Sequence, residues 1–131
     1  NRLGLTASKF FHPQAIDVLG VNSRVELAQA HATLQARRNR EIMLAGVTLY
    51  DPPSTLIAPG CVIGQDTVVS AQVQISGVTT IGRDCLIEPG CVLHDCSLGD
   101  GVTVGANAVL KQCAVPKGGS IAPLTYRCDK S

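Results

Sequence analysis

From Ile57 onward the chain repeats one pattern of apolar and polar positions every six residues. Two steps of five residues, from Leu93 to Leu98 and from Leu110 to Val115, interrupt the register. The large aliphatic positions are Ile57, Ile63, Val69, Ile75, Ile81, Ile87, Leu93, Leu98, Val104, Leu110, Val115 and Ile121. A register held over this length indicates a repeat architecture.

A second, smaller position precedes each aliphatic residue by two places. Its occupants are small or β-branched: Thr55, Cys61, Thr67, Val73, Thr79, Cys85, Cys91, Cys96, Val102, Ala108, Cys113 and Gly119. Turn-forming residues crowd the places after the aliphatic ones, as in Pro59-Gly60 and Gly82-Arg83-Asp84. Each hexapeptide therefore supplies one large inward side chain, one small inward side chain and a turn.

Three such hexapeptides form one triangular coil of a parallel β-helix, in which stacked strands lie about 4.8 Å apart. We therefore expect an all-β fold, a β-helix of about four coils, preceded by a long α-helix. Hexapeptide helices are left-handed, an exception to the usual right-handed crossover, and we expect that hand here. The expected columns are Ile57, Ile75, Leu93, Leu110; then Ile63, Ile81, Leu98, Val115; then Val69, Ile87, Val104, Ile121. An antiparallel β-sandwich is the alternative, but its variable hairpins fit strict steps of six poorly.

The first third of the chain follows a helical pattern instead. Ser23 and Glu26 fit a capping box, apolar residues then recur at mostly helical spacing, and Gly46 is placed to end the helix. The charged run at residues 37–41 is interpreted as a solvated face. Before the helix, residues 18–21 form a possible edge strand.

Composition limits the function. The 131 residues carry a net charge of +1, from 11 basic and 10 acidic side chains, which gives no electrostatic case for nucleic acid or a membrane surface. The apolar runs are too short to span a bilayer, and the first residues lack the pattern of a secretory signal. Six cysteines without such a signal favour a reduced, cytosolic setting.

The cysteines resemble a metal cluster only at first sight. All except Cys128 fall in the small inward position, which predicts buried, unreactive thiols. Cys85, Cys91 and Cys96 belong to three different columns, so they cannot converge on zinc, and no zinc is expected. Cys96 and Cys113 share a column within disulfide reach, and we expect free thiols in contact. Cys128 is expected to be exposed.

His94 is the best catalytic candidate on the β-helix. It follows Leu93 at a corner and should point outward, and hexapeptide acyltransferases use a histidine as general base at a subunit interface. A surface histidine without a role is the simpler interpretation. His12 and His31 lie outside the repeats, so a three-histidine zinc site is not available. The sequence shows no Ser-His-Asp spacing, nucleotide-binding glycine loop or H-E-x-x-H motif.

The order of segments resembles a known junction. VLGVNSRVELA at residues 18–28, a long helix, LAGVTLYDPPST at residues 44–55 and then hexapeptides are present in turn. Together they resemble the join between the two halves of the bacterial bifunctional UDP-N-acetylglucosamine pyrophosphorylase / glucosamine-1-phosphate N-acetyltransferase family. The resemblance implies that residues 1–23 end a nucleotidyltransferase domain, 24–46 form a linker helix, 47–124 the β-helix and 125–131 a C-terminal tail.

The resemblance also assigns site residues. Asn22 corresponds to a Mg²⁺ ligand of the uridylyltransferase half, a role that an amide oxygen suits. The other ligand and the glycine-rich loop would lie upstream, where a UDP-sugar or sugar phosphate would bind. Lys111 corresponds to a substrate-binding arginine of the acetyltransferase half, which uses acetyl-CoA. Pro123 stands where that half has a histidine, and the family's later lysine pair is not reproduced, so acetyl transfer by this chain is poorly supported.

We therefore expect the C-terminal hexapeptide portion of a sugar-nucleotide enzyme for cell-wall precursors, without catalytic residues of its own. A helix of about four coils buries little surface, and packing flat faces around a threefold axis covers more, which predicts a homotrimer. A stand-alone hexapeptide acyltransferase or a purely structural trimerisation module is the alternative.

Overall fold

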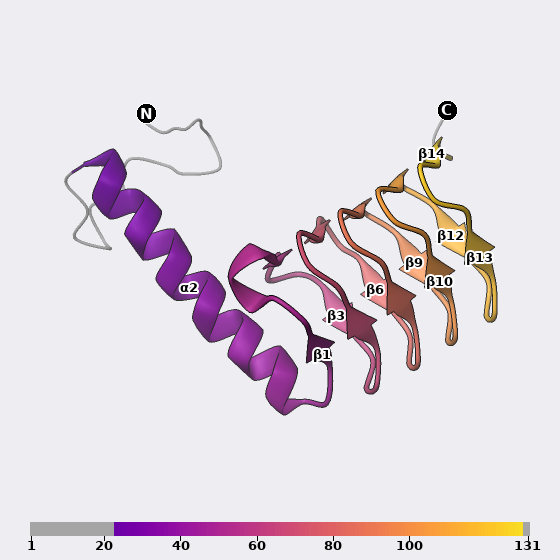
Figure 1. Ribbon diagram of the computed structural model, residues 1–131, viewed down its shortest axis with the longest axis horizontal. Helices are drawn as coiled ribbons and strands as arrows, with labels where there is room; N and C mark the ends of the chain where they lie inside the picture. Colours follow the sequence, from indigo (N-terminus) through magenta and orange to yellow (C-terminus); the bar gives the residue numbers. More distant parts are fainter. Residues whose placement is uncertain (1–22, 130–131) are drawn as a thin grey trace. The chain divides into compact units, whose positions relative to one another are not determined.

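The computed structural model describes residues 23–129, in which one long helix is followed by a solenoid of short strands (Figure 1). The chain forms two compact units that divide within the helix, at Gln35 and Ala36. The expected edge strand at residues 18–21, and the candidates His12 and Asn22, lie outside the described residues. No helix in the described part combines the length and the apolar character needed to cross a membrane.

Helix α2 spans Arg24–Leu44. Its start is capped as expected, because the Ser23 hydroxyl accepts a hydrogen bond of 3.1 Å from the backbone N–H of Glu26. Gly46 has a φ of 103° and its N–H donates to the carbonyl of Met43 at 3.0 Å. A left-handed glycine of this kind closes helices, so the sequence placed both ends of α2 within two residues.

The strands that follow pair only in parallel, which excludes the antiparallel sandwich. They are β1 (Thr48–Leu49), β2 (Leu56–Ile57), β3 (Val62–Ile63), β4 (Val68–Val69), β5 (Gln74–Ser76), β6 (Thr80–Ile81), β7 (Leu86–Ile87), β8 (Val92–His94), β9 (Ser97–Leu98), β10 (Thr103–Val104), β11 (Val109–Lys111), β12 (Ala114–Val115), β13 (Ser120–Ile121) and β14 (Tyr126–Cys128), with a 3-10 helix, η1 (Pro52–Ser54), after β1. Every third strand joins the same sheet: sheet A is β1-β4-β7-β10-β13, sheet B is β2-β5-β8-β11-β14 and sheet C is β3-β6-β9-β12.

The register confirms the three columns expected from the sequence. In sheet B, Ile75 pairs with Ile57 on one side and with Leu93 on the other. The solenoid is longer than expected, about five turns instead of four, because sheets A and B each hold five strands. Leu49 adds β1 before the period of six begins, and Arg127 places β14 beyond residue 124, where no aliphatic residue signals it.

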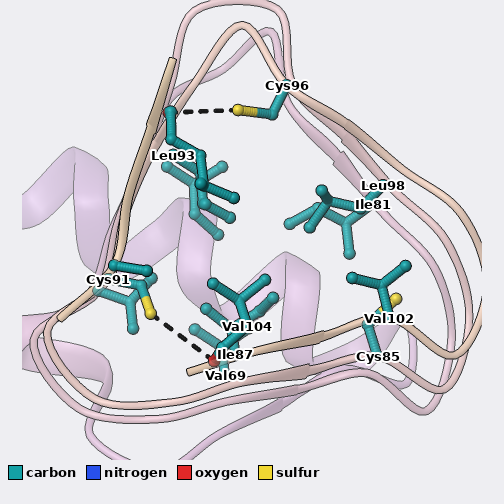
Figure 2. Packing of buried hydrophobic residues seen from close by; sticks show 14 of the residues in the cluster. Val69, Ile81, Cys85, Ile87, Cys91, Leu93, Cys96, Leu98, Val102 and Val104 are labelled. Atoms are coloured by element: carbon teal, nitrogen blue, oxygen red, sulfur yellow. Dashed lines mark hydrogen bonds between the residues drawn. The ribbon is translucent and has the colours of Figure 1, made fainter. Parts of the chain in front are cut away.

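The inward side chains fill the triangular section in two ways. Figure 2 shows aliphatic side chains such as Leu93 and Ile81 along the sides, and Cys85, Cys91 and Cys96 at three different corners. All of these side chains are buried. The large and small inward positions of the hexapeptide are therefore the middle of each side and the corner before it.

Tight corners place two demands on the backbone. A Cβ atom on Gly64 would lie 2.5 Å from the carbonyl carbon of Gly82 in the next coil, so this close approach requires glycine. Other corners hold non-glycine residues in the left-handed region, with φ between 54° and 68°: Asp66, Gln72, Asp84, Asp95, Asn107, Gln112 and Leu124. Each of these residues stores local strain.

We expect Gln72→Gly to stabilise the fold by about 0.5–1 kcal/mol, because glycine adopts a φ of 60° without steric cost. Urea denaturation followed by circular dichroism measures the change. Gln74→Gly, at an exposed position of β5 with ordinary φ, is the matched control and should destabilise. A shift of both midpoints in the same direction would contradict the strain argument.

The charged run on α2 is not the solvated face that the sequence suggested. Asn39 is 1% exposed, and its Nδ2 donates to the carbonyls of Pro52 at 3.0 Å and Thr55 at 2.9 Å. Arg38 Nη2 donates to the carbonyl of Cys61 at 2.8 Å and to two carbonyls beside it. The expectation was wrong for these two residues, because β2 and β3 are edge strands and the carbonyls that flank them need donors.

The backbone hydrogen bonds of the next coil show which donors Arg38 and Asn39 replace. There the carbonyls of Val73 and Thr79 accept hydrogen bonds from the backbone N–H groups of Leu56 and Val62 in the coil before. Thr55 and Cys61 occupy the same places one coil earlier. The C-terminal part of α2 thus supplies side-chain donors where a preceding coil would supply backbone ones.

Candidate functional site at the corner after sheet B

Polar side chains of several chemistries stack at the corner that follows sheet B. Ser76, His94, Lys111 and Cys128 end strands β5, β8, β11 and β14 and form what we call the polar ladder. The register pairs Ser76 with His94, His94 with Lys111, and Lys111 with Cys128. Neighbours in the ladder are therefore about one strand spacing apart, and the two candidates His94 and Lys111 lie side by side.

His94 points outward, as expected, and it is held by partners on two sides. The Ser76 hydroxyl lies 2.8 Å from its Nδ1, and Asp95 Oδ2 lies 3.2 Å from its Nε2. The other oxygen of Asp95 accepts a hydrogen bond of 2.8 Å from the backbone N–H of Val78. The structure thus brings together serine, histidine and aspartate, although the sequence shows no Ser-His-Asp spacing.

The sequence prediction missed the grouping of Ser76 with His94 and Asp95, because Ser76 lies one coil before His94. The register of the repeats nevertheless contained the information needed to predict it. Residues that directly follow two aliphatic positions of one column must stack, so Ile75 and Leu93 already place Ser76 beside His94.

The donor and acceptor roles of the two His94 nitrogens depend on the tautomer of the ring. In the neutral tautomer with its proton on Nε2, that proton faces the Asp95 carboxylate, which can only accept. Nδ1 then offers its lone pair to the Ser76 hydroxyl, which becomes the donor. The arrangement can accept a proton from Ser76 while Asp95 stabilises the resulting imidazolium.

The corner cysteines are chemically quiet. Burial raises the pKa of the Cys91 and Cys96 thiols, and these thiols donate to the carbonyls of Gly105 at 3.1 Å and Leu110 at 3.2 Å. No disulfide joins any of the six cysteines, and Cys128 is exposed as expected. Within residues 23–129, no group of three metal-ligating side chains converges.

The outward face of sheet B is mostly apolar. Its side chains are Leu56, Gln74, Val92, Val109 and Tyr126, which we call the sheet B face. Leu56 is 46% exposed and Tyr126 is 67% exposed. The outward row of sheet C holds Val62, Thr80, Ser97 and Ala114 and is smaller and more polar. Of the outward faces of sheets B and C, the sheet B face is the more apolar, and the polar ladder borders it.

Comparison with known proteins agrees with the repeat architecture. Residues 78–112 match the family described as bacterial transferase hexapeptide (six repeats). The solenoid is accordingly the left-handed parallel β-helix of hexapeptide proteins.

Two curated relatives match most of the chain. It is 40% identical over 124 residues to the bifunctional protein GlmU of Geotalea uraniireducens, which covers 95% of this chain and 27% of that protein. It is 44% identical over 107 residues to the bifunctional protein GlmU of Desulfotalea psychrophila, covering 82% of this chain and 32% of that protein. The chain thus spans about a quarter to a third of the length of these relatives.

Among solved structures, the acetyltransferase domain of PglB from Neisseria gonorrhoeae aligns with 67% of this chain and 63% of its own, at 23% identity. The TM-score is 0.27, so the superposition is loose.

Proposed function

Because this chain is a homologue of a hexapeptide-repeat segment of bifunctional protein GlmU, we propose that it is the C-terminal assembly scaffold of a sugar-nucleotide enzyme. The observation that carries the proposal is the match of 40% identity across 95% of the chain, which includes both the helix and the coils. In this proposal the reaction is that of a UDP-N-acetylglucosamine pyrophosphorylase, in the cytoplasm, and it serves cell-wall precursor synthesis.

In this proposal, the segment before the helix and the hexapeptide part have different roles. Uridylyl transfer would take place in a nucleotidyltransferase domain that precedes the helix and binds the sugar phosphate and Mg²⁺. Asn22 would contribute one oxygen ligand to that metal, since Mg²⁺ prefers oxygen donors. Lys111 on the polar ladder would contact substrate in the hexapeptide part, where its exposed position leaves the ammonium accessible.

The scaffold would act as a homotrimer assembled through the sheet B face. In this row Leu56 and Tyr126 are exposed and Val92 and Val109 are half-buried, and apolar side chains gathered on one flat side can mark an interaction site. A small solenoid also buries a low share of its surface within one chain. Three copies packed around a threefold axis would cover this row on every subunit.

Light scattering tests the assembly. At micromolar concentration we expect the mass of three chains, and Val109→Lys within the sheet B face should shift the mass to one chain, because three lysines cannot be desolvated together. Ala114→Lys on the outward row of sheet C is the matched control and should remain trimeric. A monomeric parent chain, or a Val109→Lys protein that still assembles, would contradict the proposal.

A further inference from the structure

We propose that Ser76, His94 and Asp95 form a working nucleophile–base–acid chain, in which Ser76 accepts acyl groups from carboxylic esters that have a good leaving group. This activity is separate from the assembly role, because it depends on the polar ladder and not on the sheet B face. Either proposal can fail while the other stands.

Geometry is the first support. The Ser76 hydroxyl lies 2.8 Å from His94 Nδ1, and Asp95 Oδ2 lies 3.2 Å from His94 Nε2. A nucleophile within hydrogen-bond reach of a base, which a third group orients, is the arrangement that activates serine in unrelated folds. The imidazole is 46% exposed, so a small ester can approach from solvent.

The fixed position of Asp95 is the second support. Its Oδ1 accepts from the backbone N–H of Val78 at 2.8 Å, which leaves Oδ2 aimed at the ring of His94. Asp95 adopts a φ of 54° at the shortened corner, where the step to the next aliphatic residue is five. The carboxylate is therefore placed by the backbone before any substrate binds.

The repeat itself supplies an internal comparison. One coil further on, the equivalent shortened corner has Lys111 and Gln112 in place of His94 and Asp95, and Gln112 has the same φ of 54°. The corner geometry is thus shared between the coils, but base and carboxylate occur together at only one of these two corners.

The reaction would run in two steps. The Ser76 oxygen bonds to the acyl carbon while its proton moves to His94 Nδ1, and Asp95 stabilises the imidazolium. The bond from the acyl carbon to the leaving group then breaks, and the leaving group takes the proton from His94. An acyl ester of Ser76 remains, and water can cleave it by the same route to release a carboxylic acid and restore the hydroxyl.

Incubation of the whole chain with p-nitrophenyl acetate tests the inference. We expect release of nitrophenol and an acetyl group on Ser76 in peptide mapping by mass spectrometry. Ser97, an outward serine of β9, is the reference within the same sample and should react at least about 100-fold more slowly, since it lacks a general base. Equal acetylation of the two serines, or acetylation confined to Lys111, would overturn the proposal.

Two variants complete the design. His94→Gln should slow acetylation of Ser76 at least about 100-fold. Asp95→Asn keeps an oxygen for the N–H of Val78 but removes the carboxylate, and it should slow the reaction at least about tenfold. Circular dichroism checks that each variant is folded. If folded Asp95→Asn reacts as fast as the parent chain, Asp95 orients nothing and the proposal fails.

Discussion

Leu93→Ala is expected to lower the free energy of unfolding by about 2–5 kcal/mol. Leu93 is 0% exposed and lies in the middle of its column, between Ile75 and Leu110. Those neighbours cannot close the resulting cavity, because the parallel hydrogen bonds fix the spacing of the coils. In a solenoid each coil contacts only the next ones, so a defect in a central coil weakens the coupling between the two ends.

Urea denaturation of the whole chain measures this loss. Leu44→Ala, at the exposed end of α2, is the matched control because Leu44 is 73% exposed, and it should change stability by less than about 0.5 kcal/mol. A domain of this size is stable by only about 5–15 kcal/mol. A loss below about 1 kcal/mol for Leu93→Ala would show that the column is not tightly packed.

The inward-facing positions of this fold could be predicted from the sequence, because burial requires apolar residues to recur at a regular spacing. Ile75, Leu93 and Leu110 must all point to one axis, and only aliphatic side chains of similar size fit there. The same reasoning correctly predicted that the corner cysteines are buried. Where burial no longer selects an aliphatic residue, as at Arg127 in β14, the pattern ended one strand too early.

The candidate site was less accessible because outward residues are not selected for a common property. His94 and Lys111 could be named one at a time, but the partners of His94 depend on which coil lies beneath it. The roles of Arg38 and Asn39 needed more than a period. Only the packing of the C-terminal part of α2 shows that their donors meet the carbonyls of Thr55 and Cys61, just before β2 and β3.

Asn39→Asp is expected to lower the free energy of unfolding at pH 7 by about 3–5 kcal/mol. Asn39 is 1% exposed, and its Nδ2 donates to the carbonyls of Pro52 and Thr55. An aspartate of the same shape loses both donors and sets a buried negative charge against two carbonyl oxygens. Arg38 cannot replace the lost donors, because its Nη2 already donates to three other carbonyls.

The deficit of Asn39→Asp should depend on pH with a definite sign. Burial and the facing carbonyls raise the pKa of the new carboxyl in the folded state above its usual value near 4. The folded variant then binds more protons than the unfolded one, so its stability is greatest below about pH 4 and is lost as pH rises through the raised pKa. Urea midpoints at several pH values, each compared with the parent chain, measure this pH dependence of stability.

Asn107→Asp, at an exposed corner with a φ of 60°, is the control. It should show neither the loss of stability at pH 7 nor its dependence on pH. Equal behaviour of the two variants would mean that the amide of Asn39 does not cap the first coil.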